Sequence, residues 1–311
     1  MKTNQTVNCV NIAYIFKTSL GSINGSWTEG NVSTVKKITL PNGTQIPYVS
    51  GQSIKYQIRK AWKEMGLAEK LSEVKQAEKK AGVDFTSGEP NLYLDDDLLG
   101  YMIASTGENR RRTAVVRTSA AVGLFPFRND RDLGTKSKEQ TGGDVAAGGN
   151  IFETEIYYNY FRVNILVELD RLGVFQDFEL SKANKGKIQP LNTEEKRQRL
   201  VYLLKALSHI WGGGKQSRLL TDMSPKFLAI TFQNTKSPIF LETLTVTENE
   251  KLNTKAIEEV LTGNSNIIEK QFLGIQSGIF KNDIDIAKLP DLKDIQTAFT
   301  EAIEYVNGLK F

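Results

Sequence analysis

The sequence has very few of the side chains that build disulfides, metal centres and catalytic triads. Cys9 is the only cysteine in 311 residues, so one chain can form neither a disulfide framework nor a cysteine-based metal site. His209 is the only histidine, which excludes the usual histidine triads and histidine-rich metal sites. An enzyme built on this sequence would have to use carboxylates, lysine or hydroxyl groups.

Long apolar segments are also lacking. No stretch approaches the roughly 20 apolar residues that span a bilayer. The opening segment, MKTNQTVNCVNIAY, lacks the apolar core of a signal peptide. We therefore expect neither secretion nor membrane insertion, and the single cysteine fits a reducing cytoplasm.

The overall composition is that of a globular protein. Hydrophobic residues make up 40% of the chain and charged residues 24%, with a formal net charge of +4. A mildly positive balance permits an anionic partner without demonstrating one, so the distribution of the charges matters more than their sum.

Two segments have the alternation that predicts strands. Residues 7–16 place Val10, Ile12, Tyr14 and Phe16 on one face. Residues 155–169 alternate most regularly, with one face formed by Phe161, Val163, Ile165 and Val167 and the other by Tyr160, Arg162 and Asn164. We expect the first face of this second strand to lie in the core and the other to be aromatic and basic.

Helices are predicted after the first strand and near the end of the chain. An amphipathic helix follows the polar segment 19–31 and is capped by Ser50 or Ser53. A second helix covers 193–211 with Gly212 as its C-cap. Further elements are a strand in 113–127, a strand at 227–232, a helix at 255–262 and a terminal helix from Asp291.

The main elements follow the order strand, helix, strand, strand, helix, strand. This order predicts an α+β protein with a ferredoxin-like, RRM-like core. Residues 67–112 have a charged, helical pattern and are interpreted as an insertion, and residues 128–150 as a hairpin or loop rich in glycine and lysine. A loop of that length inside a compact domain is usually functional or disordered.

One face of the first helix is a candidate anion site. Gln52, Lys55 and Arg59 place an amide and two cations together, which suits phosphate or sugar contacts. The simpler interpretation is a solvated helix face.

The sharpest local signal is the run GGGKQSR at 212–218. Consecutive glycines let backbone N–H groups approach an anion, and Lys215 and Arg218 follow within four positions. The run lacks the GxxxxGK[ST] spacing of a P-loop and follows a helix instead of preceding one, which disfavours a nucleoside triphosphate site. The alternative is a plain glycine C-cap followed by exposed cations.

Two charged runs have weaker signals. Arg110, Arg111 and Arg112 precede a strand that contains Arg117, and together they form a basic cluster that could equally be solvated. Residues 95–97 are three aspartates that could bind a metal. Adjacent side chains cannot all point at one ion, so we favour helix capping for them.

Four segments in order give the chain a family resemblance. They are the Gly/Asn-rich loop from Ser19 to Asn31, VSGQSIKYQIRKAW, RRRTAVVRTSAAVGL and GGGKQSRLLTDMSP. Their combination resembles the CRISPR-associated Cascade backbone subunit (the "Cas seven" family), specifically the DevR-like branch of subtype I-B. The helix beginning at Val49 looks like the family's V-S-x-Q-x-[IL]-K/R-x-x-x-R helix.

The resemblance implies a hand-like subunit that coats a guide RNA. It implies an RRM-like palm with a C-terminal extension (1–66, 113–124 and 153–311), a helical fingers insertion (67–112) and a β-hairpin thumb (125–152). The implied partners are crRNA, further copies of the chain in a helical filament, the target DNA strand paired to the guide, and other Cascade subunits: the repeat-processing, 5′-end cap, large and small subunits. No cofactor or metal is implied.

The same resemblance leads us to expect RNA contacts to phosphate and ribose. The candidate RNA-binding residues are Ser19, Asn24, Gln52, Lys55, Arg59, Arg112, Arg117, Arg162, Gly213, Gly214, Lys215, Gln216 and Arg218. Related type III subunits cut RNA with an aspartate in the loop after the first strand, where this chain has only Glu29. We therefore expect no catalysis. The alternatives are a metal-dependent ribonuclease using Glu29 or Asp97, and an unrelated small-molecule α+β enzyme.

Overall fold

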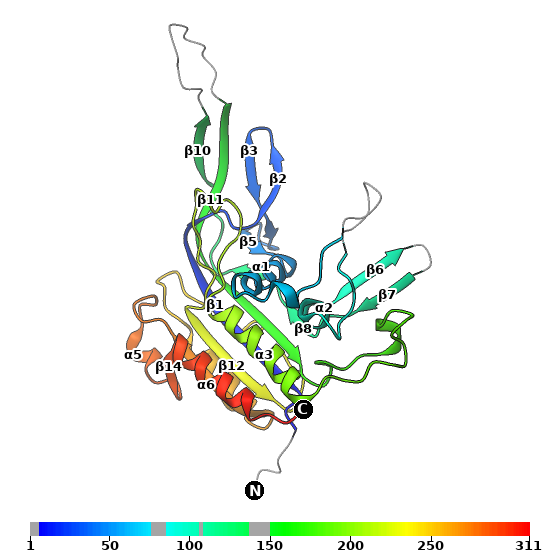
Figure 1. The fold of residues 1–311 in the computed structure, drawn as a ribbon. Coiled ribbons are helices and arrows are strands. Elements are labelled where there is room, and N and C mark those ends of the chain that lie inside the picture. The colour runs from blue at the N-terminus through cyan, green and yellow to red at the C-terminus, as the bar shows by residue number, and fades with distance from the viewer. Residues whose placement is uncertain (1–5, 76–84, 106–107, 137–149) are drawn as a thin grey trace.

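A mainly antiparallel sheet runs through the molecule (Figure 1). The computed structural model describes residues 6–75, 85–105, 108–136 and 150–311. Along the main path of the sheet the strands are β14 (Leu292–Asp294), β13 (Ile268–Ile275), β12 (Phe227–Gln233), β1 (Cys9–Gly21), β11 (Asn150–Glu168), β9 (Ala121–Gly123), β5 (Gln45–Val49) and β4 (Lys37–Thr39). The protein is a mixed α+β structure, as predicted.

The predicted order of elements is present along the chain. It consists of β1, α1 (Gly51–Glu64), β8 (Val116–Thr118) with β9, β11, α3 (Thr193–Ser208) and β12. The single strand predicted in 113–127 is two short strands, and both pair antiparallel with β11. Between them the Asn164 N–H donates to the Ser119 hydroxyl at 3.0 Å, so a side chain interrupts the ladder.

Helix ends differ from the predictions where tertiary contacts decide them. Ser50 caps α1 as expected, because its hydroxyl accepts from the Ser53 N–H at 3.3 Å. The C-cap of α3 is His209, so the prediction of Gly212 was wrong; Trp211 instead pairs with Asp222 in a β-bridge. The terminal helix α6 (Ile295–Asn307) begins after its cap Asp294, because residues 292–294 form β14.

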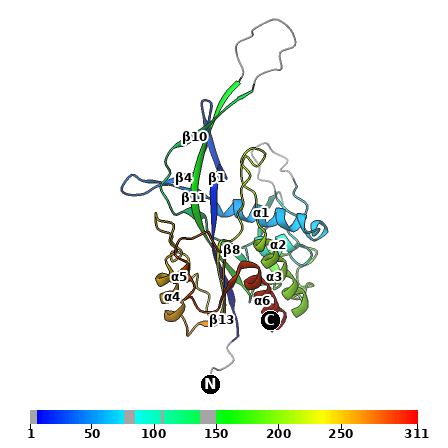
Figure 2. The ribbon, with the colours of Figure 1, turned by 90° about the vertical axis from the view of Figure 1, so that its left-hand side faces the viewer.

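Helices cover both faces of the sheet (Figure 2). On one side lie α1, α3 and α6, and their apolar residues enclose Val10, Ile12, Tyr14 and Phe16 of β1. On the other side lie α4 (Thr254–Gly263) and α5 (Asp283–Ile286), over a second core that includes Ala13 and Ile15. Helix α4 agrees with the helix predicted at 255–262.

The face of β11 that was predicted to be aromatic and basic, in contrast to the core face, is covered by the second core. The Tyr160 side chain is fully buried, its ring lies 5.7 Å from that of Phe280, and its hydroxyl donates to the Ile279 carbonyl at 3.1 Å. Residues 239–289, only partly assigned from the sequence, supply this apolar layer. The sheet therefore presents no wide open face for base stacking around Tyr160.

Residues 67–112 are less helical than predicted. Their described part contains the 3-10 turn η1 (Ala68–Lys70), α2 (Leu94–Leu99) and a hairpin of β6 (Tyr101–Ser105) and β7 (Glu108–Arg112). Tyr101 and Ile103 are buried while Met102 is exposed, which is a period of two and favours a strand. Residues 76–84 and 106–107 lie outside the described residues.

A long hairpin projects from the sheet where the glycine-rich segment was predicted (Figure 1). Strand β10 (Asp130–Lys136) pairs antiparallel with the first part of β11. Strand β3 (Val32–Val35) runs parallel to β11 and pairs with β2 (Gly25–Glu29). Most of the predicted loop, 137–149, lies outside the described residues.

Candidate functional site

The glycine-rich run forms a closed loop between α3 and β12. The Gly212 carbonyl accepts from the Thr221 hydroxyl at 2.7 Å, and the Gln216 amide donates to the same carbonyl at 2.8 Å. The side-chain oxygen of Gln216 (Oε1) in turn accepts from the Thr221 N–H at 3.1 Å. Gln216 therefore braces the loop from within, and we do not retain it as an RNA contact.

The three glycines allow close approach of the loop to the end of β1 and to α1. Gly212 and Gly213 have φ angles of 131° and 110°, which favour glycine. A Cβ atom on Gly213 would lie 2.3 Å from Ile23 Cγ2, and one on Gly212 would lie 2.3 Å from Gln57 Oε1. The Gly214 N–H donates to the Ile23 carbonyl at 2.5 Å, so this N–H is occupied inside the protein and is not retained as an anion ligand.

Lys215 and Arg218 lie at the base of the projecting hairpin. Lys215 is exposed, adopts a left-handed backbone with φ of 59°, and its Nζ lies 3.4 Å from the Ser33 hydroxyl on β3. Arg218 donates to the Thr154 hydroxyl on β11 at 2.8 Å, and its guanidinium lies 4.7 Å from the centre of the Phe152 ring. The loop thus holds two exposed cations against the strands that form the hairpin. We call Lys215 and Arg218 the loop cations.

A cavity of about 330 Å³ adjoins the loop cations. Ser19, one of the sequence candidates, is exposed on its wall. Leu20 and Leu220 are exposed at 52% and 77%, which gives the cavity an apolar rim. Its lining consists of Lys17, Thr18, Ser19, Leu20, Arg218, Leu219, Leu220, Thr221 and Asp222.

The face of α1 with the candidate residues Gln52, Lys55 and Arg59 is only partly exposed to solvent, because two of these side chains contact other segments of the protein. Arg59 forms an ion pair with Asp95 at 2.7 Å and also donates to the Ser72 carbonyl. Lys55 donates to the Leu99 carbonyl at 3.3 Å, and burial, together with the nearby Arg117 charge, lowers the pKa of its ammonium group. Gln52 is exposed. The cations of this face contact Ser72, Asp95 and Leu99 of the same chain, so Arg59 is not retained as an RNA contact.

The second basic cluster is divided between the interior and the surface. Arg112 is buried, with ion pairs of 2.5 Å to both Asp97 and Glu179, the latter in the 3-10 turn η2 (Asp177–Glu179). Its RNA-binding role is not retained, because an RNA phosphate cannot reach it. Arg117 is half exposed and pairs with Glu168 at 3.2 Å.

Two further candidates are also engaged within the protein. The Asn24 side chain is buried and donates to the Tyr48 carbonyl at 2.9 Å. Arg162 pairs with Glu242 and donates to the Glu242 carbonyl at 3.2 Å. These contacts connect strands to the loops that cover them.

The three aspartates of α2 are all buried and have different partners. The prediction that they cap the helix was wrong, because the N-cap is Tyr93. Asp95 accepts from Arg59 and Asp96 from the Glu89 N–H at 2.8 Å, and Asp97 accepts from Arg112 and Arg199 at 2.5 and 2.6 Å. Burial is the largest cause of the raised pKa of the Asp96 carboxyl. Within the described part of the chain, no three His, Cys, Asp or Glu side chains gather as a metal site.

Residues 12–255 match the protein family described as CRISPR-associated negative auto-regulator DevR/Csa2. The chain belongs to this family. A curated relative, CRISPR-associated protein Cas7/Cst2/DevR from Myxococcus xanthus (strain DK1622), is 28% identical over 175 residues, which cover 51% of this chain and 58% of the relative. The match thus spans little more than half of that relative.

Two solved structures share the fold. One, titled "CRISPR RNA-guided surveillance complex, pre-nicking", has a TM-score of 0.61 at 14% identity and covers 96% of this chain and 100% of its own. The other, titled "CRISPR RNA-guided surveillance complex", has a TM-score of 0.55 at 17% identity and covers 94% and 99%. At these identities the likeness concerns the fold alone.

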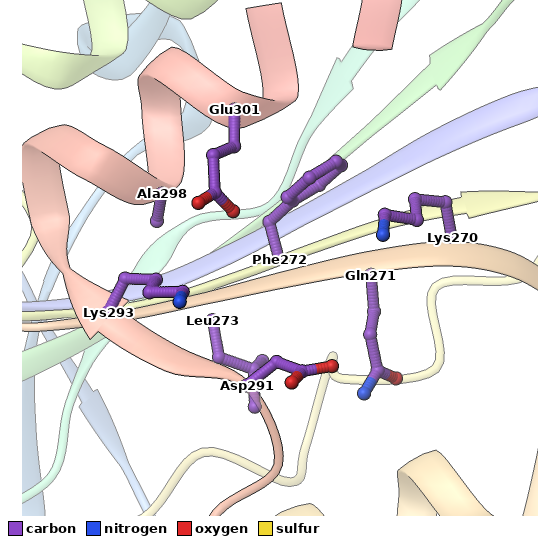
Figure 3. A pocket seen from close by; sticks show the side chains of 8 residues that line it. All are labelled: Lys270, Gln271, Phe272, Leu273, Asp291, Lys293, Ala298 and Glu301. Carbon is purple, nitrogen blue, oxygen red and sulfur yellow. The ribbon is translucent and has the colours of Figure 1, made fainter. Parts of the chain in front are cut away.

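A third region of this DevR/Csa2 family member carries cations but also balancing acids (Figure 3). A cavity of about 220 Å³ lies between β13, β14 and α6, beyond the family match. Lys270 and Lys293 line it together with Asp291 and Glu301. Lysines and carboxylates are equal in number here, whereas at the loop cations Arg218 pairs with Asp132 at 3.8 Å and Lys215 contacts the Ser33 hydroxyl. Among the residues that the structure describes, no helix has both the length and the apolar character needed to cross a membrane.

The sequence interpretation missed one exposed aromatic site. Trp27 on β2 is 81% exposed and borders a cavity of about 610 Å³ together with Lys36 and Tyr48. The available signal was a tryptophan in the otherwise polar stretch GSWTEG, which has no apolar periodicity of its own.

Proposed function

We propose that this chain binds a guide RNA as the repeating backbone subunit of a cytoplasmic Cascade complex of subtype I-B, and that it catalyses no reaction. Its partners are crRNA, further copies of itself in a helical filament, the other Cascade subunits and the target DNA strand paired to the guide. Membership of the DevR/Csa2 family and the fold shared with subunits of RNA-guided surveillance complexes support this proposal.

The fold also supports a palm, fingers and thumb. The strand order β12-β1-β11-β9 is that of a ferredoxin-like sheet, with α1 and α3 on one face. We assign 1–66, 113–124 and 153–311 to an RRM-like palm with a C-terminal extension. Residues 67–112 are then the fingers and 125–152 the thumb, whose β10–β11 hairpin leaves the palm beside the loop cations.

The observation that carries the proposal is the pair of loop cations at the base of the hairpin. Lys215 and Arg218 lie on the hydrogen-bonded glycine loop and contact β3 and β11, and Ser19 borders the adjoining cavity. Cations fixed by backbone geometry suit phosphate contacts, which position a strand without reading its sequence. We retain Gln52, Lys55 and Arg117 as outlying contacts, and the Gly213 backbone as part of the loop.

No observation favours the alternative enzyme functions. Both oxygens of Asp97 already accept from arginines, which would compete with a metal ion for the same lone pairs. Glu29 lies exposed on β2 in the described structure. A magnesium-dependent ribonuclease would cut RNA at fixed intervals, and a small-molecule enzyme would need no RNA.

Co-purification tests the proposal directly. The chain is expressed with its neighbouring genes, and bound nucleic acid is sequenced. We expect a uniform repeat-derived RNA carrying several copies of this chain and no cleavage of that RNA or of added target RNA when magnesium is supplied. A nucleic-acid-free monomer would contradict the proposal, and regular magnesium-dependent cuts would favour the ribonuclease.

Shortening the hairpin should separate RNA binding from assembly. Thr135 and Ile151 are paired, so residues 136–150 can be replaced by Asn-Gly, which suits a two-residue hairpin turn. We expect the variant to bind a short RNA with unchanged affinity but to lose length-dependent assembly on long RNA, measured by analytical ultracentrifugation. Undiminished assembly would show that the hairpin is not the thumb.

A further inference from the structure

A second cation and aromatic site lies away from the loop cations. Its cavity of about 610 Å³ is lined by Gly25, Ser26, Trp27, Lys36, Lys37 and Tyr48. Trp27 is 81% exposed, although burial of an indole normally stabilises a fold by removing a large apolar surface from water. We call this group of residues the Trp27 site.

A β-bulge sets the position of Trp27. Gly25 pairs with Val35 and Thr28 with Ser33, so Ser26 and Trp27 lie opposite the single residue Thr34. The Thr34 hydroxyl donates to the Trp27 carbonyl at 2.6 Å and fixes the bulge. Bulges of this kind redirect a side chain, and here the redirected side chain is the exposed indole.

Hydrogen bonds between neighbouring segments hold the rest of the site in place. The Lys36 N–H donates to the Asn24 carbonyl, and the Tyr48 N–H donates to the Lys36 carbonyl, both at 3.0 Å. The Asn24 side chain closes the frame by donating to the Tyr48 carbonyl at 2.9 Å. Asn24, a predicted RNA contact, is thus a positioning residue for this site.

The two lysines have different surroundings. Lys37 is anchored by Glu155 at 2.7 Å and lies 4.3 Å from the centre of the Phe127 ring. Lys36, which precedes Lys37 in the chain, lines the same cavity as the exposed Trp27 indole. The Trp27 site therefore offers an aromatic surface together with an ammonium group.

The Trp27 site and the loop cations lie on opposite faces of the sheet. Val49 belongs to the core beneath α1, so its neighbour Tyr48 on β5 faces the other way. Figure 2 places β4, which begins at Lys37, on the side of α4 and α5. The glycine loop instead packs against Gln57 of α1.

We infer that the Trp27 site binds one unpaired nucleotide, with its base stacked on the Trp27 indole and its phosphate near Lys36. Base stacking on an exposed aromatic beside a cation is the general mode of single-strand binding. The absence of large side chains at Gly25 and Ser26 leaves space for a base. The inference rests on the proposed function. It adds a contact to a base, whereas the loop cations contact phosphates.

Fluorescence of Trp27 tests the inference. The chain has three tryptophans, and the W211F variant retains Trp27 and the buried Trp62. The difference between W211F and W27F/W211F isolates the Trp27 emission. We expect uridine or deoxythymidine oligonucleotides to quench it, whereas an abasic oligomer of equal length binds through its phosphates without quenching. Stronger quenching by uridine assigns the site to guide RNA, and by deoxythymidine to the DNA strand.

Affinity measurements provide the matched comparison. Trp27→Leu should weaken uridine binding on the order of tenfold without changing its salt slope, because stacking releases no counterions. Lys36→Gln should reduce that slope, and Tyr56→Leu, an exposed aromatic on α1, should change neither. Circular dichroism verifies that each variant is folded.

Three outcomes separate the explanations. Wild-type protein that binds no RNA would overturn the proposed function itself. RNA binding with no Trp27 response would overturn only this inference. A Trp27 emission shift that follows protein concentration without nucleic acid would assign the site to a second copy of the chain and also overturn it.

Discussion

Replacing both loop cations by glutamine is expected to weaken RNA binding about 100-fold, taking about 1.4 kcal/mol for each charged contact. Lys215 contacts Ser33 and Arg218 contacts Thr154, and these two residues are paired across β3 and β11, so both cations can meet the same RNA strand. The loss should be equal for all RNA sequences. Filter binding over a range of salt should show a slope lower by about 0.7 log units for each lost phosphate contact.

The control must match the change in charge. Lys255→Gln with Lys288→Gln lowers the net charge from +4 by the same two units, to +2, at exposed positions on α4 and after α5. This control should retain the slope. Arg218→Lys should also retain it, because the positive charge remains. Equal losses in the control would mean that only overall charge matters, and a sequence-dependent loss would contradict phosphate contact.

The second large effect concerns folding. Asp97→Ala is expected to lower the free energy of unfolding by about 3–5 kcal/mol, because it removes the buried carboxylate that accepts from both Arg112 and Arg199. The Asp97 side chain is fully buried and pairs with Arg112 and Arg199, from segments far apart in the chain. Equilibrium unfolding in urea measures the effect. At urea concentrations below the unfolding transition, the variant should bind RNA with unchanged affinity.

An exposed ion pair is the matched comparison for Asp97. Glu259→Ala removes the partner of Lys255, whose side chain is 85% exposed, and should cost less than about 0.5 kcal/mol. If Asp97 held a metal, magnesium would stabilise the wild type and not the variant. If Arg112 met RNA directly, Arg112→Leu would weaken RNA binding while the protein is folded. Either result would contradict the structural role described above.

Local sequence patterns predict those helices and strands whose positions depend on residues close together in the sequence. Helix α1 begins after Ser50 because a serine hydroxyl satisfies an N–H that the helix leaves unpaired. The alternation in β1 and β11 is equally local, and both strands lie where the sequence predicts them. The end of α3 depends on the bridge between Trp211 and Asp222, and the start of α6 depends on the pairing of β14 with β13, and both were misplaced.

The cations show why a site is harder to predict than a strand. Arg59 and Lys215 look equally available in the sequence, yet Arg59 finds Asp95, 36 residues away. Arg112 finds Glu179 at a separation of 67 residues. No local pattern distinguishes an arginine that will be paired from one that stays at the surface.

The sequence predicts an anion site at the glycine run, but the role that it assigns to the glycines is only partly right. Its glycines were predicted to expose N–H groups to an anion, whereas Gly213 and Gly214 make room for Ile23 and Ser22. The cations that follow are displayed because the backbone beneath them is packed tightly. The burial of the aromatic and basic face of β11 was not predicted, because its cover comes from residues 239–289, whose patterns are short and irregular.

The length of β11 has a consequence for the geometry of assembly. This strand has 19 residues and extends about 60 Å at 3.3 Å per residue, from the interior of the sheet to the hairpin. A continuous strand resists bending far more than a flexible linker does. Under the proposed function, the interval between one copy and the next along the guide would be fixed by a rigid spacer. The protein would then act as a molecular ruler, dividing a strand of any sequence into segments of equal length.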